Sequence, residues 1–228
     1  MNRKIKLLIL LILSMSVYFI YQKTKNSTYR ITSIGDNISI GINSYGIKEY
    51  SYIDYYKDYI MKEKNKVLLN NKYSNQYITI NSILEKIKNT QSIKKDLYDT
   101  NILILTIGYN DLVYNLSIDN NINEYKLNII LNKISKDYNN LINEIRKYYK
   151  EKIIVVGYYK ANKEDVYLNI GLQRLNNILK NNEEIIYIDT YNLLNNNRKY
   201  FSNPKSIYPN RKGYIEISNK IIEKTLEK

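Results

Sequence analysis

The sequence predicts an α/β domain built as a three-layer, doubly wound, mostly parallel five-stranded sheet. Short apolar runs typical of strands alternate with longer segments in which apolar residues recur every three or four positions. The strand runs are apolar on both faces, as in parallel strands that are buried between two layers of helices. A chain of 228 residues with 44% apolar side chains is long enough for one such domain.

Five strands and five helices are expected in alternation. The strands are predicted at residues 29–34, 67–69, 101–107, 153–156 and 185–188. Apolar stripes predict helices over residues 53–60, 80–87, 134–149, 168–179 and 214–226. In doubly wound sheets ligands bind at the carboxyl ends of the strands, so the functional residues should follow the first three strands and precede the last helix.

The first 25 residues have the pattern of a targeting or anchoring segment. An apolar run over residues 7–21, interrupted only by Ser14 and Ser16, has basic residues on both sides. It lacks a small-residue cleavage site and a lipidation Cys, so we expect an uncleaved signal anchor over residues 1–25 and a domain over residues 29–228. Three basic residues precede the run and two follow it, which favours a body outside the cell membrane. A cleaved signal peptide is the alternative.

Composition excludes several kinds of catalytic site. The chain has no Cys and no His, which rules out disulfides, thiolate zinc sites and every mechanism that uses a His base or His metal ligand. A formal net charge of +13 favours anionic partners such as lipid headgroups or envelope polymers. The basic residues are spread over helical faces without a basic block, so nucleic acid is not an expected partner. The 26 Tyr are read as core and rim residues, with sugar stacking as the alternative.

Three short motifs stand at the expected positions. Gly-Asp-Asn at 35–37 follows the first strand, Gly-Tyr-Asn-Asp at 108–111 follows the third, and Lys-Ser-Ile-Tyr-Pro-Asn at 205–210 precedes the last helix. In this order they resemble the SGNH (GDSL-type) hydrolases, whose blocks read Gly-Asp-Ser, Gly-x-Asn-Asp and Asp-x-x-His-Pro-Asn. The resemblance covers roughly residues 29–228 and implies a flavodoxin-like fold and ester hydrolysis by a Ser-His-Asp triad without a metal or cofactor.

The resemblance also implies that the triad is missing from this chain. The position of the nucleophilic Ser is Asn37, whose amide is not a useful nucleophile. The position of the His base is Tyr208, a phenol that is mostly protonated near neutral pH. Lys205 stands where the family has its orienting Asp, and a cation there would not orient an imidazolium.

Other pocket positions match the family in part. Asp36, Gly108 and Asn110 agree with its motifs, whereas the Gly of the second block falls at Gln76 and puts one oxyanion donor in doubt. No catalytic residue is therefore predicted to be intact, and the seven positions form a vestigial pocket.

These observations predict a membrane-anchored, SGNH-like protein that is catalytically inactive and binds an envelope glycan, acyl-sugar or protein through the pocket. One alternative is an active hydrolase of acyl or acetyl esters that uses other residues, such as Ser206 or Ser39 with Lys205 as base; neither Ser39 nor Ser44 lies in a Gly-x-Ser-x-Gly elbow. Another is a basic interaction module that acts through its surface charge.

Overall fold

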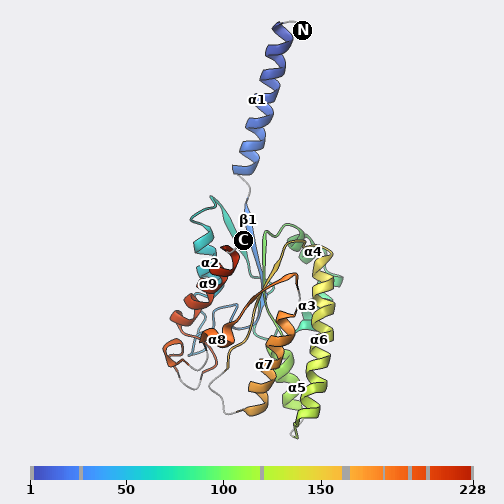
Figure 1. The fold of residues 1–228 in the computed structure, drawn as a ribbon, viewed down its shortest axis with the longest axis vertical. Coiled ribbons are helices and arrows are strands. Elements are labelled where there is room, and N and C mark those ends of the chain that lie inside the picture. Colours follow the sequence, from blue (N-terminus) through green and yellow to red (C-terminus); the bar gives the residue numbers. More distant parts are fainter. Residues whose placement is uncertain are drawn as a thin grey trace.

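The body of the protein is a parallel five-stranded sheet between two layers of helices (Figure 1). The computed structural model describes residues 3–25, 28–118, 121–160, 165–181, 183–194, 197–203 and 206–226. The strand order is β2-β1-β3-β4-β5 and all four pairings are parallel, so the predicted doubly wound sheet is confirmed. The strands are β1 (Tyr29–Gly35), β2 (Val67–Asn70), β3 (Ile102–Thr106), β4 (Ile153–Val156) and β5 (Ile185–Ile188).

The helices cover both faces of this sheet. They are α1 (Arg3–Lys25), α2 (Tyr52–Ile60), α3 (Ile80–Asn89), α4 (Gln91–Tyr98), α5 (Tyr109–Ile118), α6 (Glu124–Arg146), α7 (Val166–Lys180), α8 (Thr190–Leu194), the 3-10 turn η1 (Arg198–Tyr200) and α9 (Arg211–Leu226). Helices α2 and α9 pack together on one face, and α3, α6 and α7 form the other layer (Figure 1). Right-handed crossovers produce this division, because the chain moves one way from β1 to β2 and the opposite way afterwards.

The core lies where the central strands meet these helices. Strand β4 is buried over its whole length, and Ile31 of β1 and Leu103 and Leu105 of β3 have no exposed surface. Burying one such side chain contributes roughly 1.5–3 kcal/mol relative to leaving it in water. Helix α2 starts at a capping box in which Ser51 and Asp54 bond each other's backbone amides, which fixes the point where the chain leaves the loop.

Several helices differ from the sequence prediction. Helices α4, α5 and α8 were not predicted, and α5 begins inside the Gly-Tyr-Asn-Asp motif, which is also a common turn sequence. Helix α6 starts ten residues before the predicted stripe. Tyr149 lies beyond the end of α6 but is buried, and its hydroxyl accepts a hydrogen bond from the Leu103 amide over 3.2 Å.

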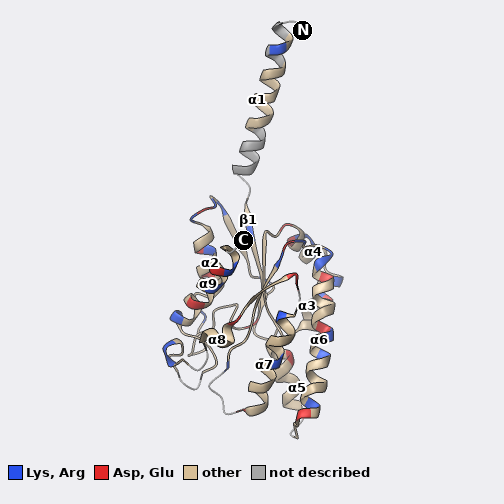
Figure 2. Ribbon diagram, viewed as in Figure 1, with Lys and Arg blue, Asp and Glu red and all other residues tan. Residues whose placement is uncertain are grey.

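Helix α1 leaves the body beside the start of β1 (Figure 1). The apolar side chains that are described between Ile9 and Val17 are exposed. Among the residues that the structure describes, no helix combines the length and the hydropathy of a membrane span. Lys, Arg, Asp and Glu are spread over the helices of the body and are not collected on one element (Figure 2).

Candidate functional site

The first motif is fixed at the carboxyl end of β1. A side chain at Gly35 would place its Cβ 2.0 Å from Oγ of Ser39, so only glycine fits there. The next residue, Asp36, is buried and accepts two hydrogen bonds, from the Ile38 amide over 3.0 Å and from the Tyr158 hydroxyl over 2.8 Å. Burial raises the pKa of Asp36 to about 6, although both hydrogen bonds act in the opposite direction.

Tyr158 is a site residue that sequence reasoning missed. It follows β4, and Asn176 of α7 holds its backbone by accepting from its amide over 2.8 Å and donating to its carbonyl over 2.6 Å. The Tyr158 ring also contacts the ring of Tyr109, with centroids 5.7 Å apart. Its position after the fourth strand of a doubly wound sheet was the available clue, since every carboxyl end faces the same edge.

The nucleophile and base positions are in direct contact. Asn37 Nδ2 donates a hydrogen bond to the Tyr208 hydroxyl over 2.6 Å. Burial raises the pKa of the Tyr208 phenol, although the bond from Asn37 lowers it, so this hydroxyl stays protonated near neutral pH. Among the described residues, no donor reaches the buried Oδ1 of Asn37.

The side-chain amide of Asn110, in the third motif, already donates its hydrogen bonds within the protein. Asn110 Nδ2 donates to the carbonyl oxygens of Gln76 over 3.0 Å and Ile78 over 2.8 Å. An amide nitrogen has two hydrogens, so this arrangement leaves neither for an oxyanion. Gln76 is exposed and meets Asn110 through its backbone, while Gly108 begins the turn with a positive φ of 118°.

Asp111 joins the third motif to helix α3. Its carboxylate accepts from the Ile80 amide at the first position of α3, at 3.2 and 3.1 Å from the two oxygens. Burial raises the pKa of Asp111 to about 6, against the effect of the bond from Ile80. Asp111 therefore has a structural role that ties α3 to α5.

The serines considered as alternative nucleophiles all have local partners. Ser39 is buried against the Tyr52 hydroxyl at 3.2 Å, and Ser44 donates to the Tyr208 carbonyl over 2.7 Å. Ser206 accepts from the Tyr208 amide over 3.0 Å. Lys205, predicted at the position of the orienting Asp, lies outside the described residues.

A small aromatic cavity joins the first, third and last motifs. Its volume is about 20 Å³, which holds little more than one water-sized group. Of the motif positions, Asp36, Asn37, Asn110 and Tyr208 line it, whereas Gln76 and Gly108 do not. Its remaining walls are Ile38, Tyr109, Tyr158, Tyr159, Leu172 and Ile207. Over the described ranges, no group of three or more carboxylates could hold a metal ion.

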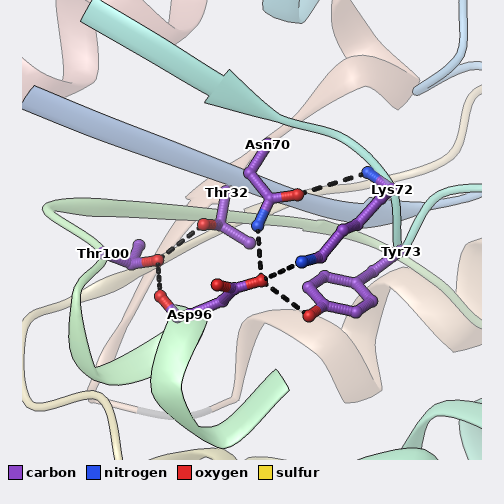
Figure 3. Close-up of polar contacts among 6 residues, drawn as sticks. All are labelled: Thr32, Asn70, Lys72, Tyr73, Asp96 and Thr100. Atoms are coloured by element: carbon purple, nitrogen blue, oxygen red, sulfur yellow. Dashed lines mark hydrogen bonds and ion pairs between the residues drawn. The ribbon is translucent and has the colours of Figure 1, made fainter. Parts of the chain in front are cut away.

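A polar network around Asp96 anchors the loop that leads to Gln76 (Figure 3). The Asp96 carboxylate in α4 accepts from Asn70 over 3.0 Å and from Tyr73 over 2.7 Å, and pairs with Lys72 at 2.5 Å. Burial raises the pKa of Asp96, but these three partners outweigh it and hold the pKa below its usual value. Thr100 links the network to β1, because it donates to the Asp96 carbonyl and bonds Thr32, both at 2.5 Å.

Comparison with known proteins agrees with this geometry. A family model described as GDSL-like lipase/acylhydrolase matches residues 31–221. The chain belongs to the GDSL-like lipase/acylhydrolase family. No curated protein matches the sequence.

Two solved structures show how widely this fold is shared. The lipase Lip_vut3 from a goat rumen metagenome is 21% identical, with a TM-score of 0.73 over 86% of this GDSL-like chain and 97% of its own. A catalytic mutant of Axe2, an acetylxylan esterase from Geobacillus stearothermophilus, is 16% identical, with a TM-score of 0.64 over 88% of this chain and 95% of its own. At these identities the likeness establishes the fold, and activity must be argued from the site.

Proposed function

We propose that this GDSL-like protein is catalytically inactive and uses its pocket to bind a ligand. The observation that carries the proposal is the hydrogen bond from Asn37 to Tyr208 at the nucleophile and base positions. Neither group supplies the chemistry of the family, because a carboxamide does not attack an ester and a protonated phenol does not take up a proton. Removal of a triad typically leaves a rate several orders of magnitude below that of the intact enzyme.

The oxyanion side of the pocket supports the same proposal. Both hydrogens of Asn110 Nδ2 bond to backbone carbonyls, so an oxyanion would have to displace one of those bonds. The amide therefore stabilises the 76–78 loop in the absence of ligand. This role is consistent with a binding protein in which the pocket frame is kept for its shape.

The cavity supports a ligand that inserts one small group. Its volume of about 20 Å³ and its tyrosine walls favour a methyl-sized end of a larger molecule, such as the methyl of an acetyl group. Oδ1 of Asn37, for which the described part of the chain supplies no donor, favours an N–H or O–H group on that ligand. An acetylated or N-acetylated envelope glycan has both features, and the acetylxylan esterase among the structural relatives makes acetylated sugars the first class to test.

We further propose that residues 1–25 anchor the protein in a membrane, with the body on the outer side. The exposed apolar side chains of α1 and the basic residues at both of its ends support this. The linker between Lys25 and Tyr29 spans at most about 14 Å when extended. The amino edge of the sheet would then face the membrane and the cavity would face away from it.

The test is ester turnover by the full-length chain in detergent, with p-nitrophenyl acetate and acetylated xylo-oligosaccharides as substrates. The native chain should be no faster than a heat-treated control. The matched variant restores the family residues through Asn37→Ser, Lys205→Asp and Tyr208→His. Turnover by this variant alone would support an otherwise intact pocket.

Binding is measured separately, by titrating the native chain with acetylated and N-acetylated oligosaccharides and following tyrosine fluorescence. Asn37→Leu should weaken binding at least tenfold, because it removes the acceptor and fills the cavity. Turnover by the native chain well above the control would overturn the proposed inactivity. Binding that is insensitive to Asn37→Leu would overturn the proposed ligand site.

A further inference from the structure

A second and larger hollow lies beside the aromatic cavity. We call it the basic cleft; its volume is about 580 Å³, within the range of ligand pockets. Residues of the loop after β1 form one wall, and residues of η1, Ser202 and residues 210–212 form the other. The residues used here are Asn43, Ser44, Glu49, Lys199, Arg211 and Lys212.

The charges in the basic cleft are unbalanced. Of the residues that the structure describes, three that line it are cationic, Lys199, Arg211 and Lys212, and one is a carboxylate, Glu49. Within the described ranges, no carboxylate lies within ion-pair distance of these three cations, although Lys72 and Arg174 elsewhere have such partners at 2.5 and 2.6 Å. The clustered like charges favour an anion in the cleft.

Two of these cations stand where the helix itself disfavours them. Arg211 and Lys212 are the first two residues of α9, a helix of 16 residues with no acidic residue in its first turn. The amino end of a helix carries partial positive charge, so cations there are destabilising. A local arrangement that opposes stability is typical of a functional site.

The backbone that carries the three cations is fixed before any ligand binds. Asn210 donates from its amide to the Tyr200 carbonyl over 2.7 Å and from its side chain to the Lys199 carbonyl over 3.0 Å. Its Oδ1 accepts from the Gly213 amide over 3.2 Å, which caps α9. The cations therefore project from a frame that loses little entropy on binding.

The basic cleft and the aromatic cavity share a wall. Ser44 lines the cleft and donates over 2.7 Å to the carbonyl of Tyr208, whose ring lines the cavity. A ligand that inserts a small group in the cavity would extend over this wall into the cleft. We propose that the basic cleft binds an oxyanion group, a phosphate or a carboxylate, of such an extended ligand.

The experiment titrates the full-length chain in detergent with inorganic pyrophosphate and, separately, with a galacturonate tetramer, by calorimetry at two salt concentrations. The cleft variant combines Lys199→Gln, Arg211→Gln and Lys212→Gln. The control variant removes the same charge from exposed lysines of the loop before β2, through Lys62→Gln, Lys64→Gln and Lys66→Gln.

The cleft variant should bind at least one probe about tenfold more weakly, and the control variant less than twofold more weakly. The stronger probe identifies the oxyanion as phosphate or carboxylate. Equal losses in both variants, or no binding of either probe to the native chain, would overturn the proposal. The cleft variant should also melt at the native temperature or above; a lower melting temperature would assign these cations to folding. The aromatic cavity, at about 20 Å³, is too small for a phosphate or a sugar ring, so this result is independent of the proposed inactivity.

Discussion

The Tyr158 hydroxyl lies 2.8 Å from Oδ2 of Asp36 and donates a hydrogen bond to it, joining the ends of β4 and β1 beneath the aromatic cavity. Both side chains are buried. A buried carboxylate is unfavourable unless it is hydrogen-bonded, so this contact compensates part of the penalty of placing Asp36 in the core. The pair supports two other cavity residues, since Asn37 follows Asp36 in the chain and the Tyr109 ring contacts the Tyr158 ring.

Tyr158→Phe should destabilise the protein more at pH 7.5 than at pH 4. Above about pH 6 the Asp36 carboxyl is ionised, so the variant loses a hydrogen bond to a charged group, about 1.5–3 kcal/mol. Near pH 4 the carboxyl is protonated and the loss should fall to about 1 kcal/mol. Urea unfolding at both pH values measures this, with Tyr159→Phe as control. Tyr159 donates to the neutral carbonyl of Ile207, so its loss should not vary with pH.

Asp36→Asn should stabilise the protein above pH 6. The folded-state pKa of Asp36 is raised to about 6 from 3.8, so the ionised group opposes folding at high pH and this effect disappears as pH falls from about 6 to about 4. The difference between these two pKa values corresponds to at most about 3 kcal/mol of unfolding free energy. Asn37 and the rest of the pocket are unchanged in the variant, which should gain about 2 kcal/mol at pH 7.5 and nothing at pH 4. A native-like pH dependence of the unfolding free energy would contradict this.

The strands could be predicted from the sequence, whereas the side-chain contacts inside the cavity could not. Strand runs that are apolar on both faces have few alternatives to a buried parallel sheet, so all five strands were found. Asp36, Asn37, Asn110 and Tyr208 line one cavity because their motifs follow strands or precede α9, on the same edge of the sheet. Tyr158 and the occupied amide of Asn110 were missed, because they depend on side-chain contacts between segments that lie far apart in the chain.

Asn110→Ala should loosen the loop before α3. The variant loses both bonds to the carbonyls of Gln76 and Ile78, at a cost of about 1–2 kcal/mol since the loop is partly open to water. Amide hydrogen exchange should accelerate at residues 76–80 and stay unchanged in β4. Asn115→Ala is the control, because its single bond to the Asp111 carbonyl stays within α5. Equal exchange in the two variants would count against a positioning role for Asn110.

Asp96→Asn should weaken the protein near neutral pH and have little effect in acid. The folded-state pKa of Asp96 lies below its usual value, so its contribution is present above the unfolded-state pKa and is lost as pH falls through the folded-state pKa. We expect a loss of about 1 kcal/mol at pH 7, since Lys72 is largely exposed and screened. Thermal unfolding at pH 7 and pH 3 measures it. Glu85→Gln removes an exposed carboxylate paired with Lys88 at 3.0 Å and should leave the transition unchanged.

Gly41 and Gly46 have nearly the same φ but different surroundings. Comparing their Ala variants therefore distinguishes the cost of backbone conformation from the cost of a steric clash. Gly41 has φ of 80° and Gly46 has φ of 78°, both in the left-handed region. A Cβ at Gly41 would lie 2.2 Å from the Glu49 carbonyl oxygen, whereas a Cβ at Gly46 meets nothing within 4 Å. Gly46→Ala should therefore cost about 1 kcal/mol from backbone conformation alone. Gly41→Ala should cost at least about 2 kcal/mol more, because the loop that forms one wall of the basic cleft has to move. Urea unfolding compares the two variants, and equal losses would mean that this loop adapts without strain.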